Sequence, residues 1–343
     1  MTAARVRPRD VESYLDVAAA GNGRTGVRMT LDLLDRGSTF DDVIVNLLGA
    51  AQHEAGQRWM RSSWSVVEEH VVSGVTQKAL DALSGTLDEE PTTGPVVVTC
   101  AEGDWHSLAG QMFAEQLRGR GVAVVFLGAS TPARHVEEFL SRHRAEALAI
   151  SCNLPLFFGG VVSLVAAAHA HGIPVLAGGR GLGAGPLRSN RLGVDAWADG
   201  IDAAIDVLNS WRRDPPALSK GGALLDPRAI ELNSLAPELG ERAFESLELS
   251  MPALSAYNDA QRARTLEDLV SMVRFTAAAR MVDEPAVLSE FLTWLLDVLR
   301  PRGVPSHAVV AGLVALEPSV SKVDPAAGRL VLAAAHAAAQ SPT

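Results

Sequence analysis

Apolar residues in the first part of the chain recur with the spacing of α-helices. In four stretches between residues 8 and 85 they lie three and four positions apart, and Gly or Asn interrupts the pattern between stretches. Such a stripe lies on one face of a helix and packs against other helices. The pattern predicts a four-helix bundle within residues 1–90, with a polar, proline-containing linker at 86–95.

A different pattern follows the linker. Short aliphatic and β-branched runs alternate with helical segments, and they occupy residues 96–100, 122–128, 147–151, 173–179 and 194–198. Strands that alternate with helices form βαβ units with parallel strands. We therefore predict an α/β domain at 91–214. Ligands of such sheets bind at the carboxyl ends of the strands.

The last third of the chain returns to helical spacing. A stretch at 212–222 carries two prolines and two glycines, which indicates a second linker. Residues 226–340 contain no strand-like run. We therefore predict a separate all-α domain at 215–343.

Composition narrows the class of protein. The 343 residues are 48% hydrophobic and 20% charged, which is typical of a globular protein. No apolar run approaches the roughly 18 residues of a membrane helix, and the first residues lack a signal-peptide core, so we expect a cytoplasmic protein. The net charge of −10 argues against nucleic-acid binding, which needs clustered Lys and Arg. Cys100 and Cys152 each end a strand-like run and are expected to be buried thiols.

A histidine follows the first predicted strand, in the stretch EGDWHSLAG at 102–110. A histidine in this position can be a hydrogen-bonded core residue, a general base, or a ligand of a metal or metal-bearing cofactor. Asp104 can accept the Nδ1 proton of His106 and leave Nε2 free to coordinate. The pair favours metal ligation, while the residues alone leave the other two uses open.

Asp104, Trp105 and His106 match the turn D-x-H-x-x-G. The stretch resembles cobalamin-binding domains in which the cofactor's own base is displaced and a protein histidine becomes the lower axial ligand. The resemblance implies a flavodoxin-like parallel-sheet domain with His106 as the cobalt ligand. The glycine of the motif is shifted by one position, because Ala109 stands in its place and Gly110 follows.

Residues after the third and fourth predicted strands extend the resemblance. Ser151 matches a serine near the buried nucleotide tail of the cofactor, and Asn153 stands where the family has a leucine. Gly178 and Gly179 match paired glycines that let the tail lie against the backbone. The resemblance implies that all four residues bind the cofactor.

The predicted bundle carries the pattern W-x9-E-H, formed by Trp59, Glu69 and His70. On one helix Val66, Glu69, His70 and Ser73 occupy positions i, i+3, i+4 and i+7, so they share a face. This pattern resembles the adenosylcobalamin photoreceptors, in which the matching residues enclose the adenosyl group. The resemblance implies that Trp59, Val66, Glu69 and His70 cover the upper face of the cofactor.

Two features separate the chain from those photoreceptors. Met60 stands where they have a histidine that binds cobalt after illumination, and a thioether is a weak ligand for oxidised cobalt. His53 or His70 could replace it. The repressors of the family also carry a DNA-binding domain before the bundle, whereas this chain has residues 226–343 after the α/β domain. We therefore expect no DNA partner.

The last segment resembles the globin-related fold of phycobiliproteins, most clearly around TLED at 265–268. Thr265 stands at the position of the cysteine that tethers a bilin, and Asp268 at that of the aspartate that binds its pyrrole nitrogens. The resemblance implies a bilin without a thioether, bound by Asp268, by arginines on its propionates and by aromatic rings. The other candidates are Arg262, Arg264, Arg274, Arg280, Tyr257, Phe275 and Trp294.

The combination of the three segments is similar to the photocobilins, which bind cobalamin and biliverdin. We therefore expect a light sensor without catalytic residues, in which photolysis of adenosylcobalamin changes the conformation, the homo-oligomer or the contact with an effector protein. A corrinoid carrier subunit of a methyltransferase or mutase is one alternative. A cobalamin-sensing module without photochemistry is another. For each single Trp, Glu-His pair or Arg, an ordinary core or surface role also remains open.

Overall fold

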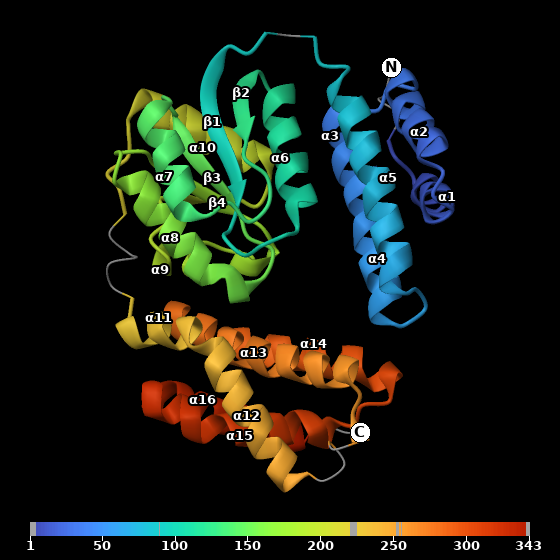
Figure 1. Ribbon diagram of the computed structural model, residues 1–343. Helices are drawn as coiled ribbons and strands as arrows, with labels where there is room; N and C mark the ends of the chain where they lie inside the picture. Colours follow the sequence, from blue (N-terminus) through green and yellow to red (C-terminus); the bar gives the residue numbers. More distant parts are fainter. Residues whose placement is uncertain (1–4, 89, 220–224, 252–253, 255, 341–343) are drawn as a thin grey trace.

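Four helical rods make up the first part of the chain (Figure 1). The computed structural model describes residues 5–88, 90–219, 225–251, 254 and 256–340. The rods are α1 (Pro8–Ala19), α2 (Gly23–Asp35), a continuous rod of α3 (Phe40–Asp42), η1 (Val43–Gly49) and α4 (Ala50–Met60), and α5 (Val66–Ser84). Their apolar faces meet in one core that includes Tyr14, Leu47 and Leu80, as the spacing predicts. The segment η1 is a π-helix, which the sequence pattern does not indicate.

The start of α5 has a local cause in the sequence. Ser65 precedes the helix and forms a capping box with Glu68, whose Oε2 accepts a hydrogen bond from the backbone N of Ser65 at 2.8 Å. The Ser65 hydroxyl accepts one from the backbone N of Val67 at 3.1 Å. These bonds place Val66 and Glu69 in the first turns of α5.

The middle of the chain forms a five-stranded parallel sheet. Its strands are β1 (Thr93–Cys100), β2 (Val122–Phe126), β3 (Ala147–Ser151), β4 (Val175–Gly178) and β5 (Ala196–Trp197), in the order β2-β1-β3-β4-β5. This is the flavodoxin-like order, and all five predicted strands are confirmed. β1 begins earlier than expected, because Thr93 already pairs with Val122 inside the predicted linker at 86–95.

Helices cover both faces of the sheet (Figure 1). They are α6 (Ser107–Gly119), α7 (Ala133–Arg142), α8 (Phe158–His169), α9 (Leu187–Arg191) and α10 (Ile201–Arg213), with short 3-10 turns η2 (Pro155–Phe157) and η3 (Arg180–Leu182). α6 and α10 pack on one face over Val96 and Val98. α7 and α8 pack on the other over Val97 and Ile150. Cys100 and Cys152 are buried, as expected.

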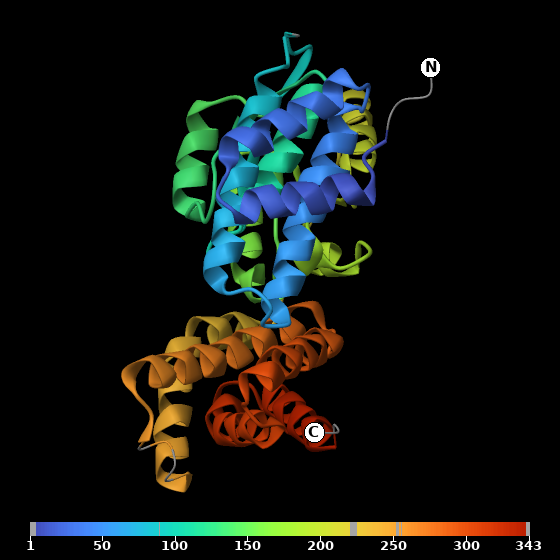
Figure 2. The same cartoon turned by 90° about the vertical axis from the view of Figure 1, so that its right-hand side faces the viewer.

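The bundle packs against α6 of the α/β part, and in Figure 2 its blue helices lie in front of that part. Met112 of α6 joins the apolar core of the bundle. Gln77 of α5 donates a hydrogen bond to Gln111 of α6 at 2.7 Å. Asp41 of α3 pairs with Arg120, which follows α6, at 2.7 Å. These contacts bring the second half of α5 beside the first half of α6 and fix α3 near the end of α6.

The last part is entirely helical in the described residues, as predicted. Its elements are α11 (Pro227–Ser234), α12 (Ala236–Ser250), α13 (Asp259–Val282), α14 (Ala286–Leu299), η6 (Arg300–Arg302), α15 (Ser306–Val323) and α16 (Pro325–Ala339). α13 packs on η2, α8 and α9, so the helices lie at the carboxyl edge of the sheet (Figure 1). Of the linker expected at 212–222, residues 212 and 213 belong to α10, and 220–222 lie outside the described residues.

The C-terminal helices share a core with the α/β part. One continuous apolar cluster contains Ile150 of β3 and Phe158 of α8 together with Phe275 of α13 and Leu288 of α14. The predicted boundary at 214/215 therefore does not separate two independent cores. None of the described helices combines the length and the apolar character that crossing a bilayer requires.

A buried arginine reinforces this junction. Arg188 of α9 donates to both carboxylate oxygens of Glu284 at 2.9 Å and to Glu290 at 3.1 Å. It also donates to the carbonyl oxygen of Gly181 at 3.3 Å. The hydrogen bonds from Arg188 hold the pKa of Glu284 below its usual range, although burial opposes the effect. The ion pair ties the loop after β4 to the start of α14.

We expect Glu284→Gln to lower the free energy of unfolding by about 1 kcal/mol at neutral pH, because Arg188 loses a charged acceptor. The folded-state pKa of Glu284 is depressed, so its contribution is present above the ordinary value of about 4.3 and disappears as the pH falls through the folded value. Urea titrations at pH 7 and pH 4 measure both parts of this prediction.

The matched control is Glu241→Gln on α12, an exposed position at which the described residues form no ion pair. Its effect should be negligible at both pH values. A loss in Glu284→Gln that is the same at pH 7 and pH 4 would show that the charge on Glu284 does not stabilise the junction.

Candidate functional site

A fully buried carboxylate organises the turn between β1 and α6. Oδ1 of Asp104 accepts hydrogen bonds from the backbone N of His106 at 2.9 Å and from its ring Nδ1 at 2.8 Å. Oδ2 accepts from the backbone N of Asn153 at 2.9 Å and from its side-chain Nδ2 at 3.1 Å. Burial raises the pKa of Asp104, but the hydrogen bonds from His106 and Asn153 outweigh burial and hold it below its usual range. Asp104 is therefore a carboxylate.

Asn153 holds the turn from the neighbouring strand. Its Nδ2 donates both to Asp104 and, at 3.1 Å, to the carbonyl oxygen of His106. Asn153 follows β3, so these bonds join the carboxyl ends of β1 and β3. A leucine could make neither side-chain bond. Asn153, which stands where the cobalamin-binding family has a leucine, thus supports the turn through its side-chain hydrogen bonds.

The His106 ring is fixed on one side and open on the other. A carboxylate can only accept, so Nδ1 carries the proton and Nε2 of the neutral ring keeps its lone pair. Nε2 has no partner among the described residues, and the side chain is 64% exposed, whereas that of Asp104 is 0% exposed. Trp105 beside it is 77% exposed. The turn thus presents an exposed imidazole nitrogen next to an exposed tryptophan.

The pKa of His106 reflects its neighbours in both parts. The hydrogen bond to Asp104 raises the pKa above its ordinary value, burial opposes this, and the charges of Asp104 and Glu69 add to the rise. Glu69 belongs to α5, the helix whose Gln77 donates a hydrogen bond to Gln111 of α6 at 2.7 Å. The bundle and the α/β part therefore meet along α5 and α6, and His106 directly precedes α6.

The predicted face of α5 is formed. Val66 is exposed, and Glu69 accepts hydrogen bonds from the Ser73 hydroxyl at 3.0 Å and from the His70 ring, whose Nδ1 lies 2.6 Å away. Gln77 continues the stripe and contacts α6. Val66, Glu69 and His70 thus lie together in the first turns of α5, while their closeness to His106 stays a prediction.

A polar chain leads from this face into the bundle core. The Ser73 hydroxyl lies 2.7 Å from Oε1 of Gln52, and Nε2 of Gln52 donates to the hydroxyl of Thr76 at 2.9 Å. Tyr14 donates to the same hydroxyl at 3.3 Å, and burial raises the pKa of Tyr14 to about 12. Because helical spacing does not distinguish a buried glutamine from an exposed one, the sequence did not indicate a role for Gln52.

The glycines of the site serve the chain's own packing. Gly110 lies where a Cβ would be 3.2 Å from Sγ of Cys100 and 3.3 Å from Cβ of Ser151, so it lets α6 lie close to the sheet. A Cβ at position 178 would lie 2.8 Å from the carbonyl oxygen of Ala198, so only glycine fits there. Gly179 has φ +110° and would place a Cβ 2.4 Å from the carbonyl oxygen of Cys152. Contact of Ser151, Gly178 and Gly179 with a cofactor stays a prediction.

Trp59 lies at the end of α4 and contacts the C-terminal helices. Its ring centroid is 6.4 Å from that of Trp294, at an interplanar angle of 30°. The guanidinium of Arg302 lies over the Trp59 ring, 5.0 Å from its centroid. The sequence interpretation assigned Trp294 to a bilin, whereas the structure brings it to the predicted cap residue. Residues this far apart in sequence give no pattern that indicates their contact.

The predicted bilin residues of α13 do not all share one face. Successive residues of a helix turn by about 100°, so Arg264 and Asp268 lie on the same side, while Arg262 and Arg274 point elsewhere. Burial raises the pKa of Asp268 to about 6, with a contribution from Glu267. Its carboxyl group has no hydrogen-bond partner in the described part of the chain.

Other predicted bilin residues have local partners. Arg262 pairs with Glu248 at 2.5 Å, and Tyr257 is partly exposed. Arg280 is held by Asp324 at 2.7 Å and by Asp226 at 2.9 Å, which makes it part of the helix packing. Phe275 stacks on Phe291 with centroids 3.9 Å apart.

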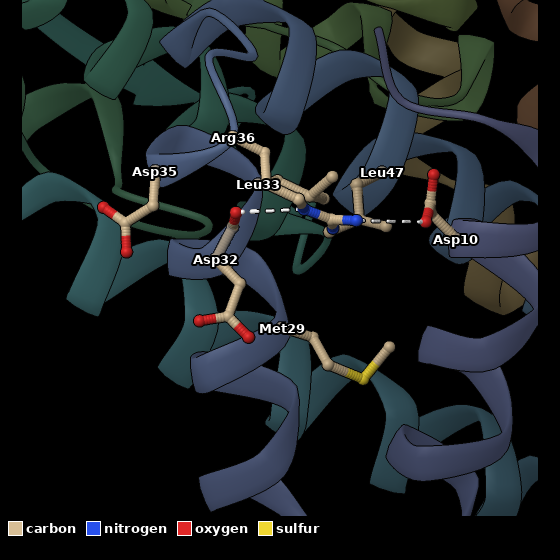
Figure 3. Close-up of a pocket in the computed structure, with 7 residues that line it drawn as sticks. All are labelled: Asp10, Met29, Asp32, Leu33, Asp35, Arg36 and Leu47. Atoms are coloured by element: carbon tan, nitrogen blue, oxygen red, sulfur yellow. Dashed lines mark hydrogen bonds and ion pairs between the residues drawn. The ribbon is translucent and has the colours of Figure 1, made fainter. Parts of the chain in front are cut away.

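Two cavities lie away from His106. One of about 400 Å³ lies in the bundle, where Arg36 extends across it, donates to the carbonyl oxygen of Asp32 at 3.1 Å and approaches Asp10 (Figure 3). Its lining is Asp10, Met29, Asp32, Leu33, Asp35, Arg36 and Leu47. The other, of about 600 Å³, lies at the amino end of the sheet and is lined by residues such as Arg142 and His171. Neither includes a predicted cofactor residue, so we place the candidate site at His106.

The chain combines a flavodoxin-like sheet, an oriented histidine after β1 and a helical bundle packed beside them. Residues 94–206 match a family model of the B12 binding domain, and residues 11–84 match a second model of the B12 binding domain. The chain is therefore a cobalamin-binding protein. Both matches end before the C-terminal helices.

The fold of a solved corrinoid protein is similar to that of part of this chain. The monomethylamine corrinoid protein of Methanosarcina barkeri is 17% identical over 60% of this chain and 100% of its own, with a TM-score of 0.51. A chain of the methanol:cobalamin methyltransferase complex of Methanosarcina barkeri is 19% identical over 60% of this chain and 81% of its own length, with a TM-score of 0.31. A cobalamin-binding protein from Desulfitobacterium hafniense DCB-2 is 18% identical over 59% of this chain and 98% of its own length, with a TM-score of 0.32. No curated protein sequence matches the chain.

We expect His106 to titrate above the ordinary histidine value of about 6.5 in the cofactor-free protein, and Asp104→Asn to lower that pKa. Because the folded-state pKa of His106 is raised, its contribution to stability is full below the ordinary value and is lost as the pH rises through the folded value. Imidazole nitrogen chemical shifts followed by NMR between pH 5 and 9 report the pKa directly. Asp206→Asn on α10 is the control and should leave the titration unchanged; an equal shift in both variants would contradict the assignment of Asp104.

Proposed function

We propose that the protein is a corrinoid carrier that holds cobalamin between the α/β part and the bundle. The observation that carries the proposal is the unpartnered Nε2 of His106, aimed out of a turn that a buried Asp104 holds, at the start of the helix against which the bundle packs. The likeness to the monomethylamine corrinoid protein of Methanosarcina barkeri supports this function.

The residues present fit the group. A cobalamin with its own base displaced needs one nitrogen ligand from the protein, and His106 offers a neutral imidazole whose tautomer Asp104 fixes. The exposed apolar surface of Trp105 and Val66 suits a broad, largely apolar ring. Ser151 and Gly178 end β3 and β4, and Asn153 and Gly179 come after them, at the edge where such a cofactor's nucleotide tail would lie.

Bound cobalamin would supply a cobalt ion that accepts and releases an alkyl group on its upper face. The chain's own residues then have separate tasks. Asp104 keeps the proton on Nδ1, so Nε2 of His106 remains a ligand. Glu69, His70 and the apolar surface of Val66 cover the opposite side and limit the access of water. Transfer of the group would take place on a partner protein, and the carrier itself would not be the catalyst.

The test is the electron paramagnetic resonance spectrum of the protein loaded with cobalamin in the Co(II) state. With ¹⁵N-labelled histidine, the nitrogen splitting should change from a triplet to a doublet, because a protein imidazole is the axial ligand. His106→Ala should lose this splitting and bind cobalamin about 10–100-fold more weakly. His70→Ala is the control and should keep the splitting. A splitting that persists in His106→Ala would exclude His106 as the ligand.

A second candidate is a light sensor that uses adenosylcobalamin together with a bilin such as biliverdin. Two observations favour it: Trp59, Val66, Glu69 and His70 lie at one end of the bundle, and the C-terminal helices, which the B12-binding matches do not reach, contact Trp59. The unpartnered carboxyl group of Asp268, whose pKa is about 6, could bind pyrrole nitrogens beside Arg264. The globin-like arrangement of these helices belongs to this proposal.

Under the second candidate, protein loaded with adenosylcobalamin in the dark should change its sedimentation coefficient after green light, and added biliverdin should give a red absorption band. Trp59→Ala should weaken the binding of adenosylcobalamin about tenfold and spare hydroxocobalamin, because only the adenosyl form reaches the indole. Trp64→Ala, in the turn that follows α4, is the matched control. A carrier without light sensing would show the same sedimentation in dark and light.

A further inference from the structure

Trp59 is held on two sides by residues of the C-terminal helices. The guanidinium of Arg302 lies 5.0 Å from the centroid of its ring, within the range of a cation–π contact. Nη2 of Arg302 also donates to the carbonyl oxygen of Trp59 at 3.2 Å. The ring of Trp294 lies 6.4 Å away and is tilted by 30°. One residue of the bundle thus makes three separate contacts with α14 and η6.

The partners of Trp59 are themselves fixed. Nη1 of Arg302 donates to the carbonyl oxygen of Val298 at 2.5 Å, which satisfies the end of α14. Trp294 lies 6.0 Å from Phe291, and Phe291 stacks on Phe275 at 3.9 Å. Phe275 and Phe291 belong to the core that the C-terminal helices share with the α/β part. The contact with Trp59 is therefore the end of a row of aromatic rings rooted in that core.

Trp59 also lies at the end of the bundle where α5 begins. It is the last residue but one of α4, and the short turn at 61–65 leads directly to Val66, the first residue of α5. Glu69, one turn further, lies on the face of α5 that continues to Gln77, which donates to Gln111 of α6 at 2.7 Å. The opposite end of the bundle is fixed to the α/β part by Asp41 and Arg120. The end that carries Trp59 is fixed by the C-terminal helices instead.

We infer that Trp294 and Arg302 are positioning residues that hold the indole of Trp59 and make the C-terminal helices part of the upper wall of the cobalamin site. This inference rests on the proposed binding of cobalamin at His106. A cobalamin with a bulky organic upper ligand meets Trp59, whereas one with a hydroxyl or water ligand does not. Trp294 and Arg302 therefore determine preference among upper ligands without touching the cofactor.

The test compares the dissociation constants of adenosylcobalamin and hydroxocobalamin in the dark. Trp294→Ala should weaken adenosylcobalamin about tenfold and change hydroxocobalamin less than about twofold, since only the first uses the placement of Trp59. Arg302→Ala should act in the same direction. Arg302→Lys should not restore binding, because an ammonium group lacks the planar face and the paired donors. Leu249→Ala and Arg242→Ala, exposed on α12, are matched controls.

A double-mutant cycle shows whether the two residues act through Trp59. In the Trp59→Ala background, Trp294→Ala should have no further effect on adenosylcobalamin, because the residue it positions is gone. Near-ultraviolet circular dichroism of the cofactor-free protein should also lose the same tryptophan signal in Trp59→Ala and Trp294→Ala. Urea unfolding confirms that each variant is folded.

The outcomes separate the inference from the proposed function. If the unsubstituted protein binds no form of cobalamin, both fail. If it binds both forms and Trp294→Ala weakens both equally, weakens neither, or adds its full effect to that of Trp59→Ala, the proposed function stands and the positioning role is wrong. Selective loss of adenosylcobalamin with no additivity supports the inference.

Discussion

The hydrogen bond between Asp104 and His106 is the interaction on which the site depends, and its cost explains the local structure. A carboxylate removed from water is unstable unless donors replace the lost solvent. Asp104 receives donors from its own turn and from Asn153, so its burial is offset only when the ends of β1 and β3 are joined. The same bonds leave Nε2 of His106 outside. A need for charge compensation thus produces an oriented ligand at the edge of the sheet.

Much of the fold follows from local pattern. Alternating strands and helices predict the parallel sheet, and the rule that ligands gather at its carboxyl edge selects His106 from the histidines of the chain. The start of β1 was missed because Thr93, Gly94 and Pro95 have no strand-like side-chain pattern, although their backbone continues the pairing with β2. Asn153 was interpreted as a departure from a family pattern, because its value depends on a contact with Asp104 across two strands.

Helical spacing shows that a face is buried and does not show what covers it. The apolar stripes of α13 and α14 predict an all-α segment equally well whether it packs alone or on the sheet. Phe275 and Leu288 in fact share a core with Ile150 and Phe158, so the segment is joined to the cofactor-binding part. The contact of Trp59 with Trp294 and Arg302 is likewise not indicated by the spacing of residues along the sequence. No motif links residues on different segments, and only the folded chain brings them together.

The continuous core also limits how the three parts can respond to a ligand. The C-terminal helices cannot move freely from the sheet, because Arg188 and the apolar cluster hold them there. The bundle has a smaller attachment at its Trp59 end, made of exposed or half-exposed side chains such as Trp294, which is 42% exposed. Such contacts open at lower cost than a shared core. Movement of the bundle must therefore break the contacts of Trp59 before it disturbs the sheet. Coupling between binding sites is reciprocal, so if Trp59 borders the upper ligand as inferred above, whatever stabilises these contacts changes the affinity for that ligand by the same free energy by which the ligand stabilises them.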